Sequence, residues 1–140
     1  MARHKLLIDI NVILDVALLR QPHYQASQQV LSLVDLKKAH GFFSAISCAT
    51  VYYLLKRELT ADEAAEYVRV LLRLLSTVEV NGRILDRALA IQVNDFEDAI
   101  QAVCAERCKA DYILTRDVRG YRSSSVRAIT PDAYLATFAN

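Results

Sequence analysis

The stretch Leu6-Leu7-Ile8-Asp9-Ile10-Asn11, close to the start of the chain, decides the fold. Its first three residues form a short apolar run that ends at a carboxylate and an amide. A short apolar run without alternation is typical of a strand that is buried on both faces of a parallel sheet. In such sheets, ligands and catalytic groups gather outside the carboxyl ends of the strands. The sequence therefore predicts Asp9 at a sheet edge where a binding or catalytic site can form.

The same alternation of short apolar runs and helical periodicity continues along the chain. We expect further strands at residues 41–44, 78–80, 112–114 and 126–129. Between and after them we expect helices at 12–19, 22–38, 47–57, 61–75, 84–91, 96–108 and from 131 onward, with Asn11, Thr60 and Asp95 as N-caps. Strands that alternate with helices favour a parallel sheet covered on both faces. The prediction is an α/β fold, a three-layer α/β/α domain over residues 1–140 with a central parallel sheet of about five strands.

Composition narrows the class of protein. The 140 residues carry 17 Lys and Arg against 16 Asp and Glu, so any contact with nucleic acid must use a local patch rather than bulk attraction. Three cysteines without a CxxC pair favour free thiols in a reducing cytosol over disulfides or zinc. Asp9 and Asp15 interrupt the N-terminal apolar run, which argues against a signal peptide, and residues 41–55 are too few to span a bilayer. We expect a soluble cytoplasmic protein with no membrane contact.

Three carboxylates fall at the same predicted edge of the sheet: Asp9 after the first strand, Asp98 at the start of a helix, and Asp117 after the fourth strand. Carboxylates that converge repel one another unless a cation lies between them, and Mg²⁺ prefers such oxygen ligands. Structural alternatives stay open, because Asp98 and Glu97 also suit the first turn of a helix capped by Asp95. Asp117 alone is an ordinary turn residue.

Polar and basic residues around these acids suggest a phosphate-binding site. Asn11 and Thr115 are expected to support the carboxylates, and Asp15 lies one helical turn after Asn11. Four basic residues cluster beside Asp117: Arg116, Arg119, Arg122 and Arg127. They form either a solvated loop or a rim that binds single-stranded RNA, with Tyr121 as a stacking platform.

At these residues the chain resembles the PIN domain family, the nuclease fold of VapC-like toxins and of several RNA-processing enzymes. Leu-Ile-Asp-Ile-Asn resembles the first motif, Asp-Phe-Glu-Asp-Ala the third and Leu-Thr-Arg-Asp the last, with Asp9, Asp98 and Asp117 as their acids. The resemblance implies a Mg²⁺- or Mn²⁺-dependent ribonuclease that acts on single-stranded or tRNA-like RNA, an antitoxin protein as partner, and a homodimer. An apolar excess at Val70 and Leu74 fits a partner or dimer face.

The second motif departs from the family pattern. The segment Ser44 to Tyr52 aligns to it, and Thr50 stands where the family usually carries a glutamate; Gly120 stands where many members have a further acid. Two alternatives to the ribonuclease therefore remain. One is a PIN-fold module that binds RNA or protein without cleaving it. The other is a phosphotransferase with Asp9 as nucleophile, although Asn11 replaces the second aspartate that this chemistry normally uses.

Overall fold

The apolar run near the start of the chain forms strand β1 (His4–Ile8), in which Leu6, Leu7 and Ile8 are fully buried. In this computed structural model, which describes residues 3–91 and 95–139, β1 is the middle strand of a five-stranded sheet of order β3-β2-β1-β4-β5. All four strand pairings are parallel. The central position of β1 explains why its side chains are apolar on both faces of the sheet.

The other strands lie close to their predicted places. They are β2 (Ala39–Ser44), β3 (Ser76–Val78), β4 (Tyr112–Leu114) and β5 (Ala128–Ile129). Leu7 lies opposite Phe42 on one side and Ile113 on the other. β3 begins and ends two residues earlier than expected, because Val78 is the residue that pairs with Ser44 at the end of β2.

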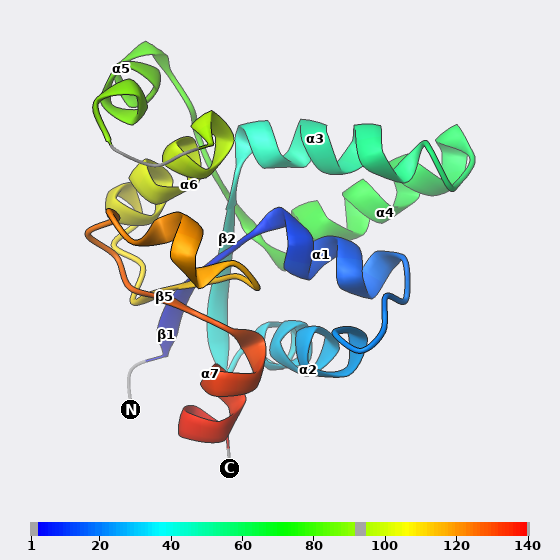
Figure 1. Ribbon diagram of the computed structural model, residues 1–140. Coiled ribbons are helices and arrows are strands. Elements are labelled where there is room, and N and C mark those ends of the chain that lie inside the picture. The colour runs from blue at the N-terminus through cyan, green and yellow to red at the C-terminus, as the bar shows by residue number, and fades with distance from the viewer. Residues whose placement is uncertain (1–2, 92–94, 140) are drawn as a thin grey trace.

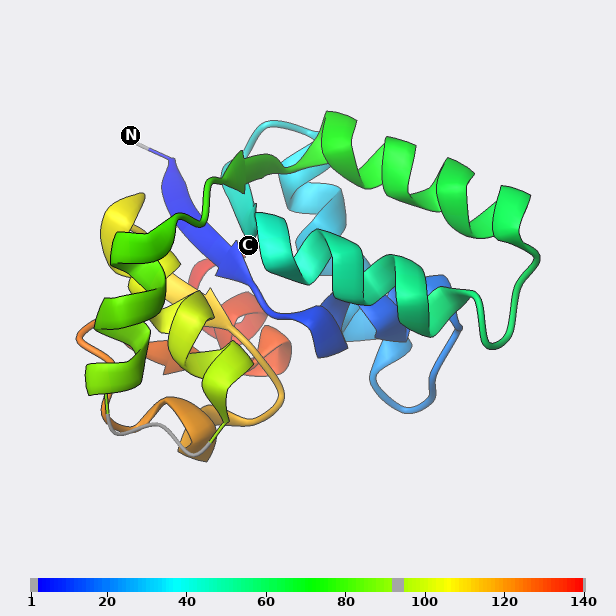
Figure 2. The same cartoon turned by 90° about the horizontal axis from the view of Figure 1, so that it is seen from above.

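Helices cover both faces of the sheet (Figure 1). One face carries five of them: α1 (Ile10–Ala17), α2 (Tyr24–Asp35), α3 (Ala45–Leu55), α4 (Ala61–Leu74) and α7 (Pro131–Phe138). The other face carries α5 (Gly82–Ala90), α6 (Phe96–Arg107) and the 3₁₀ turn η1 (Val118–Tyr121). Figure 2 shows α3 and α4 side by side, extending away from the sheet. The predicted three-layer α/β/α architecture is confirmed.

Alternation along β1 divides the apolar core into two parts. Leu6 and Ile8 pack with the α1–α4 and α7 side, whereas Leu7 packs with α5, α6 and η1. No helix within the two described ranges is both long enough and apolar enough to cross a bilayer.

Helix starts follow the predicted caps with one exception. Thr60 and Glu63 form the expected capping box of α4, and the Asp95 carboxylate accepts from the Asp98 backbone N–H at 3.1 Å. The prediction that Asn11 caps the first helix is wrong. α1 begins directly after β1, so Asp9 occupies the N-cap position, and its side chain makes no capping hydrogen bond. Because the Asp9 carboxylate is not used as a cap, it is available to the site.

Candidate active site

Three segments meet at the carboxyl edge of the sheet and bring the site together. Asp9 follows β1, Thr115 and Asp117 follow β4, and Asp98 projects from the first turn of α6. β1 and β4 are neighbouring parallel strands, so their carboxyl ends lie side by side. The structure therefore places these residues at the edge of the sheet where the sequence predicts them.

Asp9 is held by neutral hydrogen-bond donors. Its side chain is only 5% exposed. Oδ2 accepts from the Thr115 hydroxyl at 2.6 Å and from the Asn11 amide at 3.4 Å, and Oδ1 accepts from Nε2 of Gln101 at 3.1 Å. A buried carboxylate is stable only when its oxygens are paired, and here none of the partners brings a positive charge.

Gln101 is a site residue that the sequence reasoning missed. Its fully buried side chain lies 3.1 Å from Asp9 Oδ1, 3.4 Å from Asp98 Oδ1 and 2.7 Å from the Tyr121 hydroxyl, all measured from Nε2. Its Oε1 accepts from the Ser47 hydroxyl at 3.2 Å. One signal could have found it: Gln101 interrupts a run of small and apolar residues in α6, three residues after Asp98 and so on the same helix face.

The Asp98 carboxyl lies in an electrostatically unfavourable place. Burial, followed by the Asp9 and Asp95 carboxylates, raises its pKa to about 6, and Asp117 adds to the effect. The Tyr121 hydroxyl, which donates to Asp98 Oδ1 at 3.2 Å, acts in the opposite direction. When neighbouring groups oppose the ionisation of a carboxyl, a nearby cation stabilises its charged form most strongly.

Tyr121 is a structural part of this site and not the stacking platform that the sequence suggested. Its ring is packed into the core of the α6 face and is 2% exposed, which leaves no face for a base to stack on. Burial and the Asp9 and Asp98 carboxylates raise the pKa of its hydroxyl, so the phenol stays protonated and remains a donor.

Asp117 approaches Asp98 around Gly120. The Asp117 backbone N–H donates to the Thr115 hydroxyl at 3.0 Å, and its carboxylate accepts from the Gly120 N–H at 3.2 Å. A β-carbon placed on Gly120 would lie 2.9 Å from Oδ2 of Asp117 and 3.4 Å from Oδ2 of Asp98. Both carboxylates therefore reach the same small space, which the absence of a side chain at Gly120 keeps open.

Thr50, in the second-motif position, lies against Glu97 of α6. Burial, then the Asp95 and Asp9 carboxylates, raise the pKa of Glu97, while the Thr50 hydroxyl lowers it as a hydrogen-bonding neighbour. Glu97 Oε1 is buried and has no hydrogen-bond partner among residues 3–91 and 95–139.

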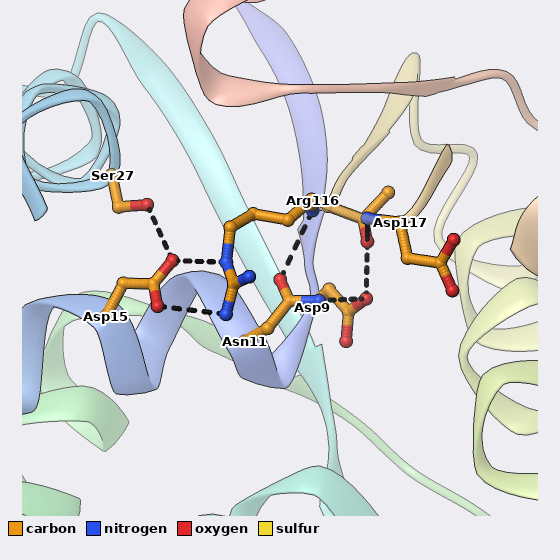
Figure 3. A network of polar contacts seen from close by, with 7 residues as sticks. Asp9, Asn11, Asp15, Ser27, Arg116 and Asp117 are labelled. Atoms are coloured by element: carbon orange, nitrogen blue, oxygen red, sulfur yellow. Dashed lines mark hydrogen bonds and ion pairs between the residues drawn. The ribbon is translucent and has the colours of Figure 1, made fainter. Parts of the chain in front are cut away.

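Arg116 forms an ion pair with Asp15, and its side chain is 31% exposed (Figure 3). Its Nε and Nη2 donate to Asp15 at 2.7 and 3.1 Å, and Asp15 is fully buried. Ser27 donates to the same carboxylate at 3.5 Å, and the Arg116 backbone N–H donates to the Asn11 side chain at 3.3 Å. Asp15 thus supports the site through Arg116, whereas the three other basic residues of the predicted cluster are exposed: Arg119, Arg122 and Arg127.

The donor set suits a hard divalent cation. The site offers carboxylate oxygens on Asp9, Asp98 and Asp117, with the buried and unpartnered Oε1 of Glu97 beside them. Across residues 3–91 and 95–139, no three acidic, histidine or cysteine side chains converge tightly enough to hold one ion. Mg²⁺ usually keeps several waters and uses only one or two carboxylates, so an open arrangement of this kind fits its chemistry.

The fold and the site together define a class of protein. It is a three-layer α/β/α domain in which carboxylates gather at the carboxyl edge of a parallel sheet. The sequence pattern of the PIN domain family matches residues 5–119, and the chain belongs to this family. The predicted family is confirmed.

Several relatives and solved structures that resemble this chain are VapC-type proteins. It is 22% identical over 139 residues to Ribonuclease VapC1 of Aquifex aeolicus (strain VF5), covering 96% of this chain and 95% of the relative. VapBC2 from Rickettsia felis, bound to a promoter DNA fragment, superposes with a TM-score of 0.71 at 12% identity over 90% of this chain and 98% of that one. VapC20 from Mycobacterium tuberculosis, a toxin that cleaves the sarcin-ricin loop, gives 0.63 at 12% identity over 77% and 86%. These superpositions show the shared fold.

Proposed function

We propose that this protein is a divalent-metal-dependent endoribonuclease and the toxin half of a toxin–antitoxin pair. The observation that carries the proposal is the placement of three carboxylates from separate parts of the chain at one edge of the sheet, where they are linked in pairs. Asp9 and Asp98 share the Gln101 amide, and Asp98 and Asp117 share the space over Gly120. The ribonuclease name of the Aquifex relative supports the same reaction class.

In this proposal Asp9, Asp98 and Asp117 hold Mg²⁺ or Mn²⁺. A bound divalent ion supplies an acidified water as nucleophile and stabilises charge on the phosphodiester. Thr115 and Asn11 keep the Asp9 carboxylate in place through the hydrogen bonds at 2.6 and 3.4 Å. Thr50 brings no charge and takes a supporting role.

We propose single-stranded or tRNA-like RNA as the substrate. Arg119 and Arg122 are exposed within five residues of Asp117, where guanidinium groups can bind phosphates. Arg116 belongs to the same proposed rim, but its guanidinium is paired with Asp15. We therefore assign its main contribution to the shape of the loop that presents Asp117.

We further propose an antitoxin protein and a second copy of this chain as partners. Several of the solved relatives are toxin–antitoxin complexes, including one from Klebsiella pneumoniae with a TM-score of 0.66 and 18% identity. On this chain, Val70 of α4 is an exposed apolar side chain and Leu74 is partly exposed, as a contact face requires.

Cleavage of an end-labelled RNA pool by the purified protein tests the activity. We expect cleavage with Mn²⁺, none with a chelator, and at least about a 100-fold loss in Asp9→Asn. Asp86→Asn, an exposed aspartate in α5, is the matched control and should cleave like wild type. Equal cleavage by Asp9→Asn and wild type, or cleavage in the presence of chelator, would contradict the proposal.

The alternative function, a PIN-fold module that binds without cleaving, is favoured by one observation, the threonine at position 50. It predicts that the protein retains RNA in a gel-shift assay with no products at any Mn²⁺ concentration. It also predicts that Thr50→Glu leaves that result unchanged.

A further inference from the structure

We propose that Glu97 supplies the carboxylate that the second motif lacks at Thr50. The fourth acid of the site then comes from the first turn of α6 instead of from α3. This inference rests on the proposed function, because it assigns a further metal-facing residue to the same site.

The first observation is the state of the Glu97 side chain. Its Oε1 is buried and accepts no hydrogen bond from the residues that the structure describes. No ion pair within residues 3–91 and 95–139 includes it. A buried carboxylate oxygen without a donor is costly, and such an oxygen is completed by an ion, a ligand or an ordered water.

The second observation is where this oxygen is held. The Thr50 hydroxyl lowers the pKa of Glu97 and the Asp9 carboxylate raises it, so both groups lie near the Glu97 carboxyl. Helices α3 and α6 are in contact, and Glu97 therefore lies between the position of α3 at which the family usually carries its second acid and the first acid of the site.

The third observation is the difference in side-chain length. The threonine at position 50 has a shorter side chain than a glutamate, and Glu97 of α6 is its neighbour. A glutamate at position 50 would need room next to Glu97 and would bring a second negative charge there. The two positions are therefore expected to exclude each other, so that one carboxylate is present at a time.

A comparison of four proteins tests this inference: wild type, Glu97→Gln, Thr50→Glu, and the double variant Thr50→Glu/Glu97→Gln. Two properties are measured, Mn²⁺ affinity by calorimetric titration and the free energy of unfolding of the metal-free protein by urea denaturation. Glu58→Gln, an exposed glutamate after α3, is the matched control.

We expect Glu97→Gln to weaken Mn²⁺ binding by about 10- to 100-fold while the metal-free protein is as stable as wild type or more so. A purely structural glutamate would show the reverse, a loss of stability with unchanged affinity. We expect the double variant to recover most of the lost affinity, because a carboxylate at position 50 then occupies the vacated space.

Three outcomes would overturn the inference. Wild-type affinity in Glu97→Gln removes Glu97 from the site, and no recovery in the double variant removes the replacement of the second-motif acid by Glu97; both leave the proposed ribonuclease intact. An absence of saturable Mn²⁺ binding by wild type removes the metal-dependent function together with this inference.

Discussion

Among single residues, Asp98 carries a carboxyl whose pKa is raised to about 6 by burial and by the Asp9 and Asp95 carboxylates. In the unfolded chain the same group has its ordinary pKa of 3.8. Between these values the folded protein binds the proton more tightly than the unfolded chain does. The resulting stabilisation is complete below the unfolded pKa and is lost as pH rises through the folded pKa. The pKa of Glu97 is also raised, so this group adds to the loss of stability as pH rises.

We therefore predict that the unfolding free energy of the metal-free protein falls between about pH 4 and about pH 7. Asp98→Asn should reduce this slope and raise stability at neutral pH, because the amide has no charge to desolvate. Urea denaturation at a series of pH values measures both effects. If the unfolding free energy of wild type and Asp98→Asn depended on pH to the same degree, Asp98 would not be the group that causes this pH dependence.

Gly120 gives a second residue-scale prediction. A methyl group there would lie 2.9 Å from Asp117 Oδ2, so the Asp117 carboxylate must move, and it would touch Asp98 Oδ2 at 3.4 Å. The glycine has no positive φ, so alanine fits the backbone. We expect Gly120→Ala to change the melting temperature little and to lower cleavage by about 10- to 100-fold, because small displacements of catalytic groups are costly.

Gly82→Ala is the matched control for this variant, because a β-carbon there meets nothing within 4 Å. Unchanged cleavage by Gly120→Ala would contradict the convergence of Asp98 and Asp117.

The sequence allowed the three aspartates of the site to be predicted because each follows a recognisable strand or helix cap. It did not reveal Gln101, since a glutamine in a helix is usually exposed and its burial depends on contacts far away in sequence. Asn11 was assigned as a cap because the helix was expected to begin two residues later than it does.

At the scale of elements, one buried ion pair joins α1 to the loop after β4. Asp15 in α1 is fully buried, and its partner Arg116 precedes Asp117 by one residue. We predict that Arg116→Ala destabilises the protein by about 3 kcal/mol, because a buried carboxylate loses its charged partner. Arg119→Ala, which removes an exposed arginine of the same segment, should change stability by less than about 0.5 kcal/mol.

Urea denaturation of both variants measures this difference, and equal stabilities would contradict a structural role for Arg116. We also expect Arg119→Ala to weaken RNA binding in a filter assay, which separates the proposed substrate contact from the structural one.

Element types were predictable from the sequence, whereas several boundaries were not. The core strand β1 and helix α4 have strong signals, a continuous apolar run and a capping box. The edge strands β3 and β5 contain three and two residues, too few for periodicity to fix their ends. α2 begins at Tyr24 rather than at Pro22, because the turn before it extends past the proline.

At the scale of the whole molecule, α2 and α4 border a groove of about 820 Å³ on the side of the sheet that carries α1. Val70 is 43% exposed on its wall, and Leu74 also lines it. None of the three site aspartates contributes to this groove. This groove and the carboxylate site are therefore separate parts of the surface.

We predict that Val70→Asp shifts the protein from dimer to monomer in sedimentation velocity experiments without lowering its stability. Leu89→Asp, at a 71% exposed position on α5, is the control and should leave the dimer unchanged. A wild-type protein that is monomeric at high concentration, or a Val70→Asp protein that remains dimeric, would rule out this face as the dimer contact.

The central claim is that Asp9, Asp98 and Asp117 form a divalent metal site. Anomalous diffraction from crystals grown with Mn²⁺ tests it most directly, because the signal locates the ion without assumptions about activity. We predict a peak within coordination distance of at least two of these carboxylates, and no peak there in Asp98→Asn crystals. Saturating Mn²⁺ with no peak at this edge of the sheet, or with a peak only elsewhere on the protein, would contradict it.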